Sequence, residues 1–301
     1  MEKIKEALRG GLPCDNNGYL DSYLNNIFTG YMPDKFRNMF MDGSGNELRS
    51  KAAAVHSSSM LGYNFFHWVS EKYPLTIQGI KYTKVFFEVK MAVLKGTLPA
   101  NMDILLVGEK EGKMQLLFLE SKFLEFLEKR KFILGVSYRN KDKWLYKEKD
   151  WFPFLTDVQN CVNEDNDCVY EEGIKQGVSH LFAITNLVND NEEAITDFIV
   201  NNEFLNGYLD DDSIRCAEFH FINIIFKPSE KQFKAEYDKY YAYETLYKKF
   251  ISIAEKHKCI EPYFMTYSEL WKKAEKEIMK VNNGHLHQYL NDRYMRFAEM
   301  K

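Results

Sequence analysis

Hydrophobic residues gather in two runs near the middle of the chain, and a short charged turn separates them. The runs cover residues 102–107 and 116–122, and both stay apolar until polar residues appear at their ends. Strands that are apolar on both faces are typical of the covered centre of a sheet. The turn at residues 108–113 predicts that the two strands pair as an antiparallel hairpin. We therefore expect the polar residues at the strand ends to lie at an edge of the hydrophobic core.

A long helix is predicted upstream of this hairpin. Apolar residues recur at helical spacing over residues 47–72, and Pro74 would end the helix. Its middle, residues 56–64, is small and polar, so two interpretations stay open. Either another backbone comes close at this point, or the helix presents Ser58 and Asn64 to a site. We favour the first interpretation because small residues commonly mark a crossing point.

The remaining pattern of the first two thirds of the chain alternates strands with helices. Residues 84–94 and 218–226 are rich in β-branched and aromatic residues and are predicted strands. Between them we expect a helix over about residues 167–176 and a short strand at 180–185, which this crossover would set parallel to a neighbour. Glu88 lies inside the first strand, where a buried charge is costly unless it is paired or bound to metal. The alternative is a strand with one face in water.

The tail of the chain has a different character. Capping-box patterns begin at Ser229 and Thr266, and they predict helices that run to about residues 258 and 281, with one more near the end. We therefore expect residues 227–301 to be entirely helical, packed on the preceding domain or appended to it.

Composition narrows the class of protein without naming a function. The formal net charge of −4 does not indicate a nucleic-acid binder and does not exclude one, because only local patches matter at a groove. The 23 Phe and 19 Tyr argue against disorder. Five scattered cysteines, no signal-peptide pattern and no apolar run of membrane-spanning length predict a cytoplasmic protein that does not enter membranes.

The polar ends of the hairpin carry the chemistry. Asp103 begins the first strand, and Glu120-Ser121-Lys122 ends the second. An antiparallel hairpin brings these ends together, with Glu120 and Lys122 on one face. Two carboxylates, water and phosphate oxygens are what Mg²⁺ (or Mn²⁺) needs. Lys122 could stabilise developing negative charge or, with a lowered pKa, act as a base.

This arrangement resembles the PD-(D/E)xK superfamily of restriction-endonuclease-like nucleases, and the Ser- and Asn-bearing block at residues 56–66 and the block at 170–184 resemble a bacterial branch of it. Two departures are visible: Met102, not Pro, precedes Asp103, and Ser121 is polar where an apolar residue is common. The resemblance covers roughly residues 47–226.

The resemblance implies a fold, a set of ligands and a substrate. The fold is α/β, a restriction-endonuclease-like αβββαβ core with a mixed central sheet flanked by helices, within a domain of residues 1–226 and followed by the helical extension. Glu88, Asp103 and Glu120 would hold the metal, Lys122 would activate water, and Gln176 would position water or substrate. The activity would be hydrolysis of phosphodiester bonds, with DNA as the partner. Cutting both strands commonly needs a dimer, so a homodimer would suit this function.

A basic stretch follows the candidate site at residues 129–149. Its positive charges and interleaved aromatic rings could contact nucleic acid, or they could form a solvated surface with the rings as anchors for a loop. The residues in question are Lys129, Arg130, Lys131 and Arg139.

Two alternatives compete with catalysis. The chain could be a catalytically inactive nucleic-acid-binding or protein-interaction module of the same fold. Alternatively, Glu120 and Lys122 could form an ordinary solvated ion pair at a strand end. The separation of the carboxylates and their access to water distinguish these hypotheses.

Overall fold

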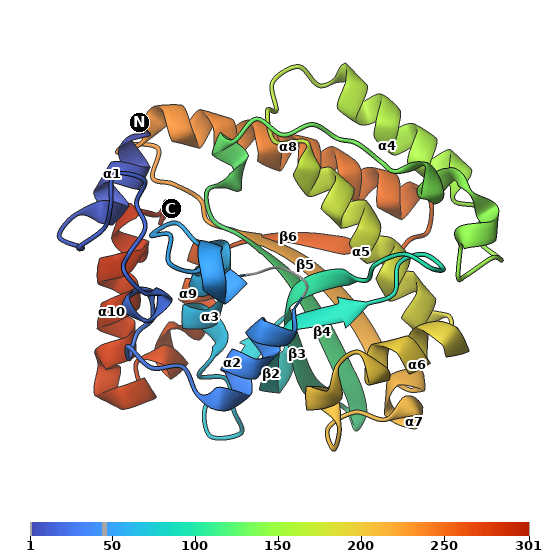
Figure 1. Ribbon diagram of the computed structural model, residues 1–301, viewed down its shortest axis with the longest axis horizontal. Helices are drawn as coiled ribbons and strands as arrows, with labels where there is room; N and C mark the ends of the chain where they lie inside the picture. The colour runs from blue at the N-terminus through green and yellow to red at the C-terminus, as the bar shows by residue number, and fades with distance from the viewer. Residues whose placement is uncertain (1, 44–46, 301) are drawn as a thin grey trace.

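A mixed six-stranded sheet forms the centre of the molecule (Figure 1). The structure is a computed structural model, and it describes residues 2–43 and 47–300. The strands lie side by side in chain order: β1 (Leu75–Ile77), β2 (Ile80–Met91), β3 (Ala100–Lys110), β4 (Lys113–Lys122), β5 (Glu218–Ile225) and β6 (Pro262–Thr266). Neighbours from β1 to β4 are antiparallel, whereas β5 is parallel to β4 and β6 is parallel to β5.

The predicted hairpin is confirmed as β3 and β4. A two-residue loop, Glu111 and Gly112, joins the strands, and both residues have positive φ, 55° and 77°. This is the backbone that a tight loop needs if it is to match the twist of the flanking strands. The strands are longer than predicted because alternating polar residues extend them into solvent beyond the apolar runs.

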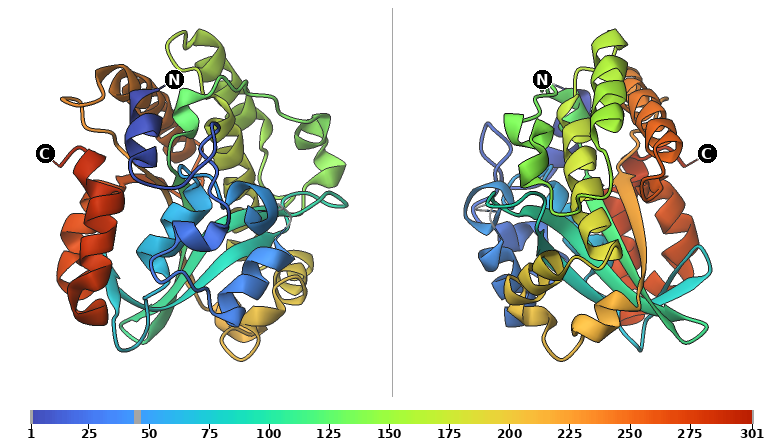
Figure 2. Two further views of the ribbon diagram at one scale, coloured as in Figure 1. Left: turned by 60° about the vertical axis from the view of Figure 1, so that its left-hand side comes forward. Right: turned by 90° about the vertical axis from the view of Figure 1, so that its right-hand side faces the viewer.

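Helices cover both faces of the sheet, as Figure 2 shows from two sides. One face packs against α5, α6 and α8, and the other packs against α2, α3 and α9. The helices are α1 (Lys3–Arg9), α2 (Asp34–Asp42), α3 (Ser58–Phe66), α4 (Phe152–Glu164), α5 (Glu172–Val188), α6 (Glu192–Val200), α7 (Asp211–Arg215), α8 (Lys234–Lys256), α9 (Tyr267–Ile278) and α10 (His285–Arg293). Among the described residues, no helix combines the length and the apolar character that crossing a membrane requires.

The prediction of one long helix over residues 47–72 is wrong. The structure has a π-helical turn at Glu47–Lys51 and then the short helix α3. The Ser57 side chain accepts a hydrogen bond from the backbone N–H of Met60, so this serine starts a new helix instead of lying inside an old one. Gly62 explains the small residues of α3, since a Cβ there would lie 3.1 Å from Ile104 and 3.3 Å from the Ser121 hydroxyl. Gly62 thus accommodates side chains of β3 and β4, and not the neighbouring backbone that the sequence predicted.

The predicted division of residues 167–185 into a helix and a strand is also wrong. Residues 180–185 belong to α5, which is one continuous helix and is buried along most of its length. A short apolar run does not distinguish a buried strand from a buried helix. The strand that follows the crossover is β5, and its predicted position at residues 218–226 is confirmed.

The tail is not entirely helical, because β6 extends the sheet beside β5. The capping box of Thr266 and Glu269 is confirmed at the start of α9. Ser229 does not cap a helix, since α8 begins only at Lys234. Arg293 of α10 donates hydrogen bonds to the carbonyls of Leu8 and Val55, so the C-terminal part is tied to the N-terminal part.

Candidate active site

Three carboxylates lie in one row across the centre of the sheet. The register of β2, β3 and β4 places Glu88, Asp103 and Glu120 at successive cross-strand positions. All three line one cavity of about 600 Å³, together with Lys122. The structure therefore brings together the four residues that the hairpin and the preceding strand were predicted to contribute.

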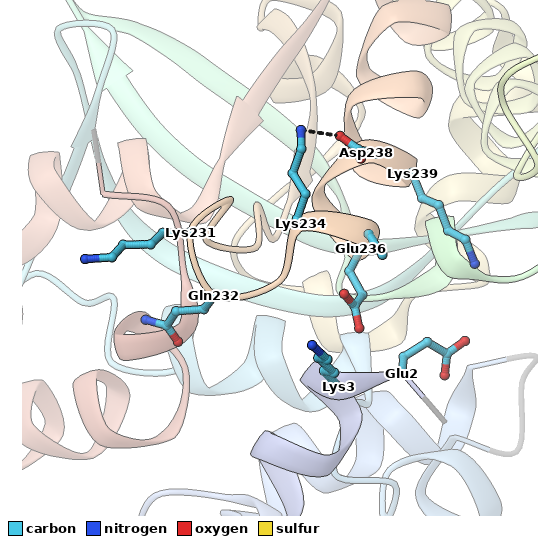
Figure 3. A pocket seen from close by; sticks show the side chains of 9 residues that line it. Glu2, Lys3, Lys231, Gln232, Lys234, Glu236, Asp238 and Lys239 are labelled. Atoms are coloured by element: carbon cyan, nitrogen blue, oxygen red, sulfur yellow. Dashed lines mark hydrogen bonds and ion pairs between the residues drawn. The ribbon is translucent and has the colours of Figure 1, made fainter.

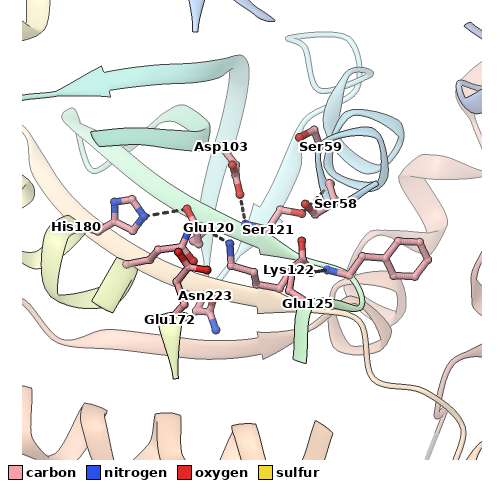
Figure 4. Close-up of polar contacts among 12 residues, drawn as sticks. Ser58, Ser59, Asp103, Glu120, Ser121, Lys122, Glu125, Glu172, His180 and Asn223 are labelled. Carbon is pink, nitrogen blue, oxygen red and sulfur yellow. Dashed lines mark hydrogen bonds and ion pairs between the residues drawn. The ribbon is translucent and has the colours of Figure 1, made fainter. Parts of the chain in front are cut away.

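Glu120 is held from two sides, as Figure 4 shows. The Lys122 ammonium donates to Glu120 Oε1, and His180 Nε2 of α5 lies 2.9 Å from Oε2. Burial opposes ionisation of this carboxyl, but the charges of Lys122 and His180 outweigh it and lower its pKa to about 2. Burial likewise opposes the charge of Lys122, and Glu120 outweighs it, so the pKa of Lys122 lies well above its ordinary value.

Asp103 is positioned by the backbone of the next strand. Its Oδ2 accepts a hydrogen bond of 2.7 Å from the N–H of Ser121. Burial, and next the negative charge of Glu120, raise the pKa of Asp103 well above its ordinary value. The half-buried Asp103 and the buried Glu120 thus compete for the positive charge of one lysine, and a cation would relieve that competition.

Glu88 has an unusual backbone. Its φ is +54° in the middle of β2, a left-handed conformation that costs a residue other than glycine about 1 kcal/mol or more. The side chain accepts a hydrogen bond of 3.2 Å from Asn101 Nδ2. Burial, and then the charge of Glu47, raise the pKa of Glu88 to about 8. Of the two interpretations left open for Glu88, a buried group or a strand face in water, its exposure of 4% favours the first.

The walls of the cavity come from α3, the π-helical turn and α5. Ser59 Oγ donates to Glu47 Oε2 over 3.1 Å, and the Ser58 carbonyl accepts from Ser121 Oγ. Gln176 lines the cavity from α5, where its Oε1 accepts a hydrogen bond of 3.3 Å from the Tyr170 hydroxyl. Ser58 and Gln176 therefore line the cavity beside the row of carboxylates, as predicted for Gln176. For Ser58, this position supports the interpretation that was less favoured from the sequence.

Asn64 lies elsewhere. It is buried, its Oδ1 accepts from the N–H of Phe28, and its Nδ2 donates to the Asn26 carbonyl and the Tyr294 hydroxyl. These contacts join α3 to both ends of the chain. The structure thus gives Asn64 a packing role, and Asn64 does not line the cavity.

The basic stretch contributes one residue to the cavity, Arg130. It is paired with Glu128 and Glu172, and Lys131 is paired with Glu171. Lys129 and Arg139 are exposed and lie outside the cavity lining.

The aromatic rings of this stretch hold its loop in place. Trp144 is buried and donates from Nε1 to the Tyr138 carbonyl, while the Tyr138 hydroxyl lies 2.5 Å from Ser179 Oγ. From the sequence, these rings could either contact nucleic acid or anchor the loop. The contacts favour the second interpretation.

Sequence reasoning missed three residues of the site, Glu47, Lys51 and His180. His180 was assigned to a strand, although its spacing of four from Gln176 would place both on one face of a helix. Glu47 and Lys51 gave no signal, because only the fold of the intervening turn brings them to Ser59 and the sheet.

The donor set suits a hard divalent cation in part. Mg²⁺ needs one or two carboxylates plus waters, and Asp103 and Glu120 keep acceptor lone pairs beyond their present hydrogen bonds. Within residues 2–43 and 47–300, no group of three Asp, Glu, His or Cys side chains is already arranged to hold an ion. Binding would therefore involve a shift of Glu120 or Glu88 toward Asp103.

A second cavity lies between α1 and the start of α8 (Figure 3). Its charges are of both signs, and Lys234 pairs with Asp238 across 2.7 Å on the surface of α8. Such a pair is solvated and contributes little. The buried carboxylate of this cavity, Glu236, accepts a hydrogen bond of 3.4 Å from the N–H of Ile4 at the start of α1.

Comparisons of the chain with protein-family models, with curated proteins and with solved structures gave no match. The fold class is α/β with a mixed sheet. The function therefore has to be argued from the site itself.

Proposed function

We propose that this protein is a metal-dependent nuclease that hydrolyses phosphodiester bonds of DNA. The observation that carries the proposal is the row of Glu88, Asp103 and Glu120 on three adjacent strands, with Lys122 beside it in one cavity. Buried carboxylates of this kind are retained at a cost in stability, which favours a functional reason for them.

The order of the elements supports the resemblance to the PD-(D/E)xK nucleases. In chain order, α3, the antiparallel strands β2 to β4, a crossover that includes α5 and the parallel strand β5 give the order αβββαβ. The additional strand β1 lies between α3 and β2, and α4, α6 and α7 are further elements of the crossover. Asp103 and Glu120-Ser121-Lys122 occupy the second and third of these strands. β6 and the helices around it lie outside the part of the chain that the resemblance covers.

In the proposed reaction, the carboxylates and the lysine of the cavity would have different roles. Glu88, Asp103 and Glu120 would hold Mg²⁺ or Mn²⁺, which supplies polarisation of the phosphate and a lowered pKa of bound water. Water would form the new P–O bond and release its proton to solvent as the bond to the leaving oxygen breaks, and the leaving oxygen would take up a proton from solvent. Lys122, whose pKa is raised, is suited to stabilise the negative charge on phosphate as a cation and not to act as a base.

His180 and Gln176 would serve as positioning residues. His180 fixes the orientation of the Glu120 carboxylate by its contact of 2.9 Å. Gln176 carries a side-chain amide into the cavity, where it can bind water or a phosphate oxygen.

A catalytically inactive module of the same fold is the second candidate. The observation in its favour is that Lys122 and His180 already occupy both oxygens of Glu120. In that case the carboxylates would be structural, and nucleic acid or a partner protein would bind without a divalent ion.

Cleavage assays separate the two candidates. Wild-type protein, Asp103→Ala and Lys122→Ala are incubated with DNA and Mg²⁺ or Mn²⁺. The proposal expects cleavage by the wild type and a loss of at least a hundredfold in both variants, a magnitude usual for groups that stabilise transition-state charge. Equal cleavage by all three proteins, or none by any, would contradict it.

A further inference from the structure

Of the four candidate catalytic groups, three are buried and Asp103 is half-buried. Glu88, Glu120 and Lys122 are 4%, 4% and 5% exposed, at the sheet side of the cavity. The other walls come from parts of the chain that are far apart in sequence: Tyr19, residues 47–59, residues 124–130 and residues 170–180. A phosphate has to pass between these walls before it can reach the row of carboxylates.

We propose that the substrate is single-stranded DNA, in the form of an unpaired end or gap, and not the interior of a duplex; this inference rests on the proposed nuclease function. A duplex is a stiff rod with a persistence length of about 50 nm, so its phosphates stay on the outside of a wide cylinder. A duplex phosphate can come between these walls only if the duplex is bent or a nucleotide is unpaired and unstacked, which a single strand does not require.

The charges of the residues that line the cavity also favour a single-stranded substrate. Among the described residues that line the cavity, seven are acidic and four are Lys or Arg. Three of the four are already paired with glutamates: Lys51, Lys122 and Arg130. A duplex carries one negative charge per about 1.7 Å of its axis and binds best to a dense basic surface. A flexible single strand has a lower charge density, so a few Lys or Arg residues and a bound metal ion would be enough to attract it to the cavity.

Tyr19 provides a place for a base. It lines the cavity, and 40% of the residue is exposed. Its backbone is fixed, because its N–H donates to Asp15 Oδ1 over 2.8 Å and Tyr19 forms a β-bridge with Ala54. Aromatic rings at the edge of such cavities stack on unpaired bases, and each stacked base strengthens binding by about tenfold or more.

The test compares one labelled oligonucleotide as a single strand and as a blunt duplex, with Mn²⁺ present. The proteins are the wild type, Asp103→Ala, Tyr19→Ala, Tyr19→Phe and the control Tyr241→Ala, which removes an exposed tyrosine from α8. We expect kcat/KM to be at least tenfold higher for the single strand. Tyr19→Ala should raise KM about tenfold with kcat little changed, while Tyr19→Phe and Tyr241→Ala behave like the wild type.

The contradicting outcomes are distinct. If the duplex is cut as fast as the single strand or faster, and Asp103→Ala is inactive, the nuclease function stands and the single-strand inference falls. If Tyr19→Ala cuts the single strand as the wild type does, the stacking role of Tyr19 falls. If the wild type cuts neither form, the proposed function falls, and the inference falls with it.

Discussion

Two cavities of this protein contain similar side chains in different surroundings. In the cavity over the sheet, the side chains of Lys122 and Glu120 are each 6% exposed. In the cavity between α1 and α8, those of Lys234 and Asp238 are 64% and 57% exposed. Burial makes each member of the first pair dependent on the other, whereas water can replace either member of the second. The difference shows that desolvation, and not the number of charges, marks the candidate active site.

The largest expected effect comes from breaking the buried pair. Lys122→Met leaves Glu120 buried with only His180 as a partner, and we expect the free energy of unfolding to fall by about 3 kcal/mol. Lys234→Met is the matched control, and it should leave the urea midpoint unchanged. Equal midpoints for the two variants would show that burial does not distinguish the pairs.

A second comparison uses histidines inside and outside the cavity over the sheet. Burial lowers the pKa of His56 to about 4, so between pH 6.5 and 4 the unfolded chain binds a proton that the folded chain does not. His56 should therefore make the free energy of unfolding fall as the pH falls through this window, and its own contribution is at most about 1.4 kcal/mol per pH unit.

Urea unfolding at several pH values measures this slope. His56→Gln should flatten it, and His285→Gln, which changes an exposed residue of α10, should not. An unchanged slope in His56→Gln would show that His56 titrates alike in the folded and unfolded chains.

The smallest expected effect on stability comes from the hydrogen bond between Tyr267 of α9 and Ser121 of β4. The Tyr267 hydroxyl lies 2.7 Å from Ser121 Oγ, and both groups are buried. Tyr267→Phe removes this hydrogen bond and should lower the free energy of unfolding by about 1 kcal/mol. Tyr241→Phe, which removes an exposed hydroxyl, should have no effect. If the two variants have the same stability, the hydrogen bond contributes nothing.

The parts of the fold that could be predicted are those with a signal in neighbouring residues of the sequence. The hairpin of β3 and β4 and the capping box at Thr266 have short-range signals, and both are confirmed. Residues 180–185 are apolar enough for a strand, but α5 is covered by the sheet and by α8, and its pattern therefore loses helical periodicity. β6 was missed because its five residues gain stability from pairing with β5, which is distant in sequence.

The residues of the candidate site also fall into those that the sequence could identify and those that it could not. Asp103, Glu120 and Lys122 could be identified because strand geometry brings them together. Glu47 could not, because the turn at Glu47–Lys51 reaches the sheet only through tertiary packing. His180 was missed because residues 180–185 were assigned to a strand, which hid its helical spacing from Gln176.

Anomalous diffraction from crystals soaked in Mn²⁺ would show whether these carboxylates bind a divalent ion. We predict a peak between the carboxylates of Asp103 and Glu120 that disappears in Asp103→Ala. No peak at saturating Mn²⁺, with Glu120 still bound to both Lys122 and His180, would contradict it.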